Sequence, residues 1–90
     1  MPERRVVVGS KVGLHARPAA IFVQAAAKQP VKVSIAKGEG GAPVDARSIL
    51  AVLGLDVRGG QEVVLSAEGD AAESALDELA EVVATDHDAT

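Results

Sequence analysis

The segment Val31-Lys32-Val33-Ser34-Ile35-Ala36 constrains the fold most, because its large apolar side chains recur at every second position. Successive side chains of a strand point to opposite faces, so this pattern predicts a strand with one buried face and one polar face. A sheet made of such strands needs a second layer on its apolar face only. The segment therefore predicts a two-layer α+β fold with one face of the sheet open to water.

Three further segments are short, apolar or β-branched, and bounded by turn residues, which predicts strands at 4–9, 42–46 and 62–67. The turn Lys-Gly-Glu-Gly-Gly at 37–41 joins two of the four predicted strands. We therefore expect a hairpin formed by 31–36 and 42–46.

Helical spacing of apolar residues predicts one helix at 18–28, which Pro30 stops, and a second at 48–55. Ser48 is a natural N-cap for the second helix and Gly54 a natural end.

A final helix is expected after Asp70, which we interpret as its cap. Its apolar stripe consists of residues 72, 75, 76, 79 and 83. Its acidic face consists of Glu73, Asp77, Glu78 and Glu81. The acidic face is interpreted as a solvated surface. The predicted order of elements is β-α-β-β-α-β-α.

Ninety residues allow one domain, which we place at 1–90, ordered over about 3–84 with a short polar tail at 85–90. Phe22 is the only aromatic residue and the formal net charge is −4. Both features count against nucleic-acid binding, which uses stacking platforms and neutralises phosphates. The chain has no cysteine, which excludes disulfides, zinc-thiolate sites and thiol catalysis. Since no apolar run is long enough to span a bilayer, we expect a soluble cytoplasmic protein.

The run Gly13-Leu14-His15-Ala16-Arg17-Pro18-Ala19 is the candidate chemical site. Proline is favoured in the first turn of a helix, where backbone N–H groups lack intrahelical acceptors and attract anions. Arg17 adds a planar fork of donors suited to phosphate oxygens. Because histidine can act as a nucleophile in covalent transfer, His15 is the candidate acceptor of a phosphoryl group.

With these elements and this motif, the chain resembles the histidine-containing phosphocarrier (HPr) family of the bacterial phosphoenolpyruvate-dependent sugar phosphotransferase system. Three stretches carry the resemblance, which covers about residues 3–84: 13–19, Ala46-Arg47-Ser48-Ile49-Leu50-Ala51-Val52-Leu53-Gly54-Leu55, and Val64-Leu65-Ser66-Ala67-Glu68-Gly69. The resemblance implies an open-faced sandwich, a four-stranded antiparallel sheet covered on one face by three helices.

The resemblance also implies a function. His15 accepts a phosphoryl group on Nδ1 from phosphorylated Enzyme I and passes it to Enzyme IIA domains for sugar uptake, and Arg17 is the cation beside the phosphohistidine. Such a protein is a covalent carrier and not a turnover enzyme, and we expect it to be a monomer without cofactor or metal.

Partner binding is implied at an apolar patch, Ile49, Leu50 and Leu53, with Arg17 and Ala20 beside it. From the residues alone, we expect Val52 to point inward and the patch outward, because a helix that is apolar on most sides often marks a binding surface.

Ser48 falls at the regulatory serine that a dedicated kinase phosphorylates in some bacterial groups. The additional partners implied are a serine kinase/phosphorylase and a transcriptional regulator. Its simpler interpretation is a plain N-cap, which does not exclude regulation.

Some positions depart from the family pattern, namely Val12, Gln24, Ala27 and Ala51. Lysines are common in the family at the positions of Gln24 and Ala27, so Arg17 is left with few basic neighbours, such as Lys11 and Arg47. The departures weaken the expectation of a basic rim that steers acidic partners.

Two other functions are weighed against the relay. A regulatory module that signals by docking alone is disfavoured because His15 is present, whereas a nitrogen-regulatory paralogue also keeps this histidine. A small enzyme lacks support, since no acid or base lies near His15 in sequence. His87, between Asp86 and Asp88, is not interpreted as a metal site, because three adjacent tail residues cannot converge on one ion.

Overall fold

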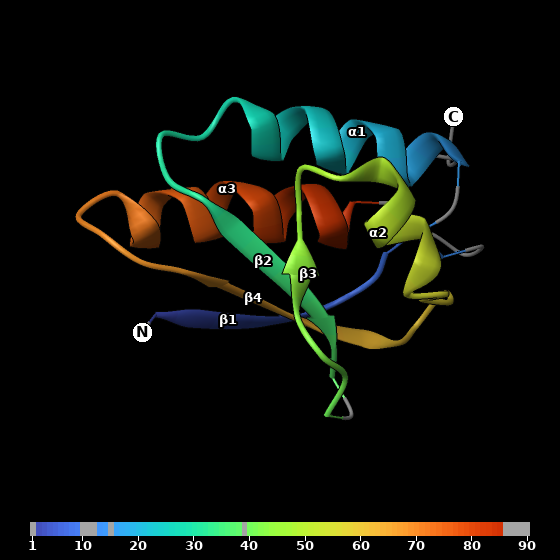
Figure 1. Ribbon diagram of the computed structural model, residues 1–90. Helices are drawn as coiled ribbons and strands as arrows, with labels where there is room; N and C mark the ends of the chain where they lie inside the picture. The colour runs from blue at the N-terminus through green and yellow to red at the C-terminus, as the bar shows by residue number, and fades with distance from the viewer. Residues whose placement is uncertain (1, 10–12, 15, 39, 86–90) are drawn as a thin grey trace.

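The computed structural model describes residues 2–9, 13–14, 16–38 and 40–85, and its elements follow the predicted order (Figure 1). The elements are β1 (Glu3–Val7), α1 (Ala16–Ala27), β2 (Val33–Lys37), β3 (Val44–Asp45), α2 (Ile49–Gly54), β4 (Glu62–Ala67) and α3 (Ala72–Ala84).

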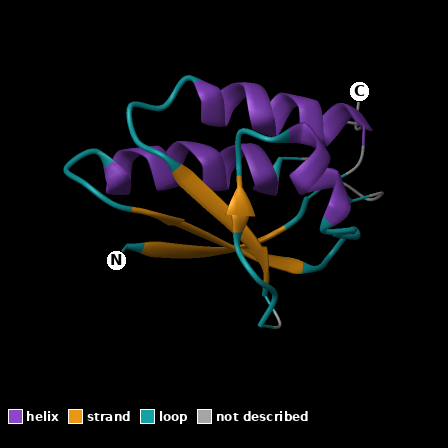
Figure 2. Ribbon diagram, in the orientation of Figure 1, coloured by secondary structure: helices purple, strands orange, loops and turns teal. Residues whose placement is uncertain are grey.

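The strands in the described part of the chain form one four-stranded sheet in the order β1-β4-β2-β3, with every neighbouring pair antiparallel. The last strand lies at the centre: Ser66 of β4 is aligned with Glu3 of β1 on one side and with Ser34 of β2 on the other. The helices lie on one face of this sheet, with α1 and α3 side by side (Figure 2). The predicted two-layer, open-faced architecture is confirmed.

Burial alternates along β4, and it alternates in β2 as predicted up to Ile35, after which Ala36 is buried as well. In β4, Val63, Leu65 and Ala67 are buried, whereas the residues between them are at least partly exposed. In β2, Val33 and Ile35 are buried under the helices. The core that these strands share with the helices is aliphatic around a single aromatic side chain; its largest fully buried members include Phe22, Ile35, Leu65, Leu76 and Leu79.

The apolar stripe predicted for the last helix is confirmed. Its five residues, Ala72, Ala75, Leu76, Leu79 and Val83, are all buried. The opposite face makes contacts that the sequence did not predict: Arg4 of β1 donates hydrogen bonds to Asp77 and Glu73. The hydrogen bond to Asp77 is the main cause that raises the pKa of Arg4. Part of the acidic face therefore fastens the edge strand β1 to α3.

The helix boundaries differ from the prediction at two N-termini. Helix α1 begins at Ala16, so Pro18 is its third residue; the first four N–H groups of a helix have no intrahelical acceptor, and Pro18 removes no bond there. Helix α3 is preceded by Ala71 without a side-chain cap, so the interpretation of Asp70 as the cap is wrong. A turn closed by the N–H of Ala72 and the carbonyl of Gly69 leads into that helix instead.

β1 and β3 are shorter than predicted, because each ends where the chain turns toward another element. β1 ends at Val7, and the N–H of Gly9 donates to the carbonyl of Val83 at 3.0 Å instead of continuing the ladder. The predicted strand 42–46 is reduced to Val44–Asp45. None of the described helices is long and apolar enough to cross a membrane.

Candidate functional site

The predicted phosphoryl site lies at the start of α1. His15 lies outside the described residues, as do Lys11 and Val12. The site is therefore described from the residues on either side of them. Leu14, Pro18 and Ala19 are buried, whereas Ala16 and Arg17 are exposed. Leu14 and Ala19 therefore anchor the motif in the core, and Arg17 is presented to solvent.

The first turn of α1 favours an anion. It contains no acidic residue, so the positive end of the helix dipole is not neutralised there. Among the ion pairs of the described residues, none involves Arg17. Arg17 is accordingly available for an external oxyanion.

Gly13 fixes the approach to this turn. Its φ is +84°, a conformation that favours glycine. A Cβ at this position would lie 2.2 Å from the carbonyl oxygen of Val57 and 2.6 Å from the Cα of Arg58. The adjacent N–H of Leu14 donates to that same carbonyl at 2.9 Å. The motif is thus held directly against the loop that follows α2.

Helix α2 begins as predicted. Ser48 has extended backbone angles, and its Oγ accepts a hydrogen bond from the N–H of Ala51 at 3.3 Å, which confirms it as the N-cap. Before it, the Oδ1 of Asp45 accepts from the N–H of Arg47 at 2.9 Å. This hydrogen bond is the largest cause that lowers the pKa of Asp45, and the charges of Arg47 and Lys32 act in the same direction.

The C-terminal end of α2 is only partly as predicted. Gly54 is the last helical residue, yet the left-handed conformation falls on Asp56, with φ of 51°. Aspartate tolerates this region better than most residues, so the chain turns away two positions later than a glycine stop predicts.

The orientation predicted for α2 is confirmed. Val52 is fully buried, whereas Leu50 is 80% exposed and Ile49 and Leu53 are each 37% exposed. Ala20 of α1 is half-buried, and α1 packs against α2. The apolar patch therefore exists on the surface, next to the helix that carries Arg17.

The positions that depart from the family pattern are consistent with a weaker basic rim. Gln24 and Ala27 are exposed on α1, and neither carries a charge. Sequence reasoning missed one cation nearby, Arg58, whose main chain packs on Gly13 although 45 positions separate them in the chain. No periodicity or motif signals this contact.

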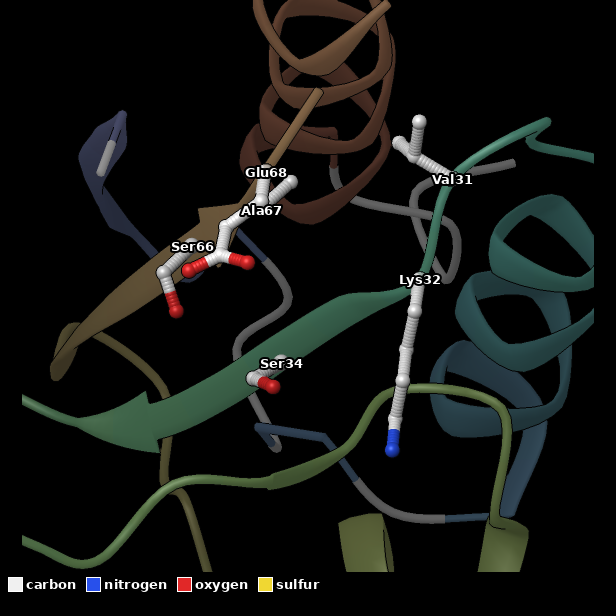
Figure 3. Close-up of a pocket in the computed structure, with 6 residues that line it drawn as sticks. All are labelled: Val31, Lys32, Ser34, Ser66, Ala67 and Glu68. Carbon is white, nitrogen blue, oxygen red and sulfur yellow. The ribbon is translucent and has the colours of Figure 1, made fainter.

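A hollow of about 410 Å³ lies elsewhere, where β2 begins and β4 ends (Figure 3). Its lining residues are Val31, Lys32, Ser34, Ser66, Ala67 and Glu68. β2 follows the C-terminal end of α1, so this hollow is not part of the site at the helix start. Within the described residues no group of three histidine, cysteine or acidic side chains could hold a metal ion, and His87 lies outside them.

The structure is thus a small open-faced sandwich in which an anion-favouring helix start lies beside a short helix with an exposed apolar face. Residues 2–85 match the family model described as the PTS HPr component phosphorylation site. The chain belongs to this family, the phosphocarriers that relay phosphoryl groups from Enzyme I to Enzyme II of the phosphotransferase system and are not themselves catalytic enzymes.

Individual relatives agree with this assignment. The chain is 57% identical over 84 residues to the phosphocarrier protein HPr of Streptomyces coelicolor. The aligned region covers 93% of this chain and 89% of that protein. It is 42% identical over 83 residues to the HPr-like protein Crh of Bacillus subtilis, covering 92% and 95% of the two chains. The crystal structure of HPr from Bacillus anthracis is similar with a TM-score of 0.84 and 40% identity, covering 91% of this chain and 95% of that one.

Proposed function

We propose that His15 carries the phosphoryl group of this relay. The observation that carries the proposal is the family match across residues 2–85, which includes the His15 motif at the start of α1. In the first transfer, the bond between phosphorus and a histidine nitrogen of Enzyme I breaks as a bond from phosphorus to the His15 ring forms. The reverse exchange passes the group on to an Enzyme IIA domain. Catalysis of such an in-line displacement rests on positioning and charge.

Arg17 is the proposed cation beside the phosphohistidine. It is exposed on the first turn of α1, where no acidic side chain competes for it. Its guanidinium can hold two phosphoryl oxygens at once, while the helix start adds backbone N–H donors and a favourable dipole.

The apolar patch, Ile49, Leu50 and Leu53 with Ala20 beside it, is the proposed docking surface for both Enzyme I and the IIA domains. Large apolar side chains this exposed on a short helix favour burial against a partner.

Ser48 is the proposed regulatory position, acted on by a serine kinase/phosphorylase. A phosphate on Ser48 stays at the N-terminus of α2, where a negative charge is favourable, so the helix is retained. The new charge lies next to Ile49 and Leu50 in sequence and opposes the docking of acidic partners. A transcriptional regulator is the further partner proposed for the modified form.

We further propose that the chain acts as one domain and as a cytoplasmic monomer. The nitrogen-regulatory role is the alternative, because its members also keep the histidine. The two roles differ in the Enzyme I that supplies the phosphoryl group, so the donor distinguishes them.

The test is incubation with purified Enzyme I of the sugar system, phosphoenolpyruvate and magnesium, followed by intact mass and peptide mapping. One acid-labile phosphoryl group on His15 is expected in the wild type, and none in His15→Ala. His87→Ala, which removes the only other histidine, is the matched control and should be phosphorylated like the wild type. Absence of modification by a competent Enzyme I would refute the sugar-system role and direct the test to the nitrogen-system donor.

A further inference from the structure

The loop that follows α2 presents a charged pair on either side of a buried anchor. Val57 is 3% exposed and belongs to the core. Asp56 and Arg58 flank it, and their side chains are 73% and 77% exposed. The Nη2 of Arg58 lies 3.5 Å from the Oδ2 of Asp56, so the two charges are paired at the surface.

The main chain of this loop is fixed although the side chain of Arg58 is not buried. Val57 accepts from the N–H of Leu14, and the N–H of Arg58 donates to the Oε1 of Gln61 at 2.8 Å. The N–H of Gly60 donates to the carbonyl of Val8. Together with the close approach of Gly13, these bonds hold the Cα of Arg58 against the phosphoryl-site segment.

Arg58 is one of three arginines on or next to the two helices that carry the apolar patch and its neighbour Ala20. Arg47 precedes α2, Arg58 follows it, and Arg17 lies on the first turn of α1, which packs against α2. The exposed positions of α1 that follow, Gln24 and Ala27, add no charge. The whole chain carries a net charge of −4, which repels an acidic protein, so local cations must favour its docking.

We propose that Arg58 is a specificity-determining cation for the acidic proteins that exchange the phosphoryl group with this chain, and that Asp56 is its counter-ion in the free protein. The proposal rests on the proposed function. An exposed ion pair contributes little free energy, so Arg58 can exchange Asp56 for a carboxylate of the partner at small cost. Docking brings this carboxylate to the end of α2, next to the patch that the partner covers.

We predict opposite effects for substitutions of Arg58 and Asp56 on the KM of transfer from phosphorylated Enzyme I. Both KM and kcat of this transfer are measured. Arg58→Gln raises KM about threefold to tenfold with kcat unchanged, because a docking charge is lost. Asp56→Asn lowers KM, because the partner's carboxylate no longer competes with Asp56 for Arg58. Asparagine tolerates the positive φ at this position. Both differences shrink at 0.5 M salt, where surface charges are screened over roughly 4–5 Å.

Lys28→Gln is the matched control, because it removes an exposed positive charge just after the far end of α1 and should leave KM unchanged. Urea unfolding of each variant checks that the fold is retained. An unaltered KM in folded Arg58→Gln overturns the inference while leaving the relay intact. A shorter lifetime of isolated phosphohistidine with an unaltered KM also overturns it, since Arg58 then serves the phosphoryl group and not the partner. A wild-type protein that accepts no phosphoryl group refutes the proposed function and this inference together.

Discussion

At the scale of single residues, this site depends on side chains whose structural and chemical roles coincide. Ser48 stabilises the start of α2 through its Oγ, and the same hydroxyl is the proposed site of a regulatory phosphate. Asp45 orders the chain just before it, since Oδ1 accepts from the N–H of Arg47 and its carbonyl accepts from the N–H of Ser48. The local hydrogen bonds therefore set the direction in which α2 leaves the sheet.

Replacement of Ser48 by alanine should lower the free energy of unfolding by about 1 kcal/mol, because the N–H of Ala51 loses its acceptor. Urea denaturation followed by far-UV circular dichroism measures this loss. Ser74→Ala, at an exposed position inside α3, is the control and should be neutral or slightly stabilising. Equal effects of the two substitutions would show that the cap contributes nothing.

Replacement of Arg17 by lysine should slow phosphoryl transfer by about tenfold while the free energy of unfolding stays unchanged. Lysine keeps the charge but cannot hold two oxygens with one planar group. Rapid-quench transfer from phosphorylated Enzyme I measures the rate. An Arg17→Lys rate equal to that of the wild type would show that Arg17 acts as a charge alone.

Asp45 gives the stability a pH dependence with a defined sign. Its pKa in the folded protein is lowered below the ordinary value of 3.8, first by the N–H of Arg47 and then by nearby positive charge. Its stabilisation is therefore complete above pH 3.8 and is lost as the pH falls through the lower folded pKa.

Asp45→Asn keeps an acceptor oxygen but removes the titration. The stability advantage of the wild type over this variant should narrow below pH 3.8 in urea titrations at several pH values. A difference that stays constant down to acid pH would contradict this account of Asp45.

At the scale of elements, α2 separates stability from docking on two faces of a helix of six residues. Val52 is fully buried and packs in the core, whereas Leu50 projects to solvent from the same two turns. A helix this short is stabilised mainly by tertiary packing. Its exposed face can therefore be selected for partner binding with little effect on the fold.

The two faces predict opposite outcomes for a pair of alanine substitutions. Val52→Ala should destabilise the protein by about 2 kcal/mol, because it leaves a cavity in the core. Leu50→Ala should change stability by less than about 0.5 kcal/mol, yet raise KM for Enzyme I about tenfold. Unfolding and transfer kinetics measured on both variants test the separation; a Leu50→Ala protein with normal KM would remove the patch from the docking surface.

At the scale of the whole molecule, the ends of distant elements meet at positions where only a small residue fits. Gly9, just after β1, lies so close to the end of α3 that a Cβ would be 1.9 Å from the carbonyl oxygen of Ala84. Gly13 makes the comparable contact with the loop after α2. These contacts hold the segment between β1 and α1 against the end of α3 and against the loop after α2.

Gly9→Ala should therefore destabilise the protein by about 2 kcal/mol or more, because the end of α3 has to move. Gly54→Ala is the control, since nothing lies within 4 Å of a Cβ there and the residue is helical. That control should be neutral or stabilising by about 0.5 kcal/mol, as a helical glycine is replaced. Urea denaturation measures the free energy of unfolding of both variants. A Gly9→Ala protein as stable as the control would contradict the close contact between Gly9 and Ala84.

The order of elements, the burial of Val33 and Ile35 in β2, and the stripe of α3 were predictable from the sequence, because they depend on side-chain spacing within one segment. Ser48 as a cap and Val52 as the buried residue of α2 were predictable for the same reason. The cap of α3 was not, because the chain enters this helix through a turn in which the N–H of Ala72 donates to the carbonyl of Gly69, and no side chain caps it.

Which segments meet depends on packing between parts of the chain that are distant in sequence. The central place of β4 in the sheet depends on pairings between residues such as Glu3 and Ser66, which local propensity does not encode. The same holds for Arg4 on Asp77 and for Arg58 beside Gly13. The chemical motif and the two-layer class can be read from short spacings along the chain. The contact of the motif with the loop after α2 follows from long-range packing, which brings the main chain of Arg58 against Gly13.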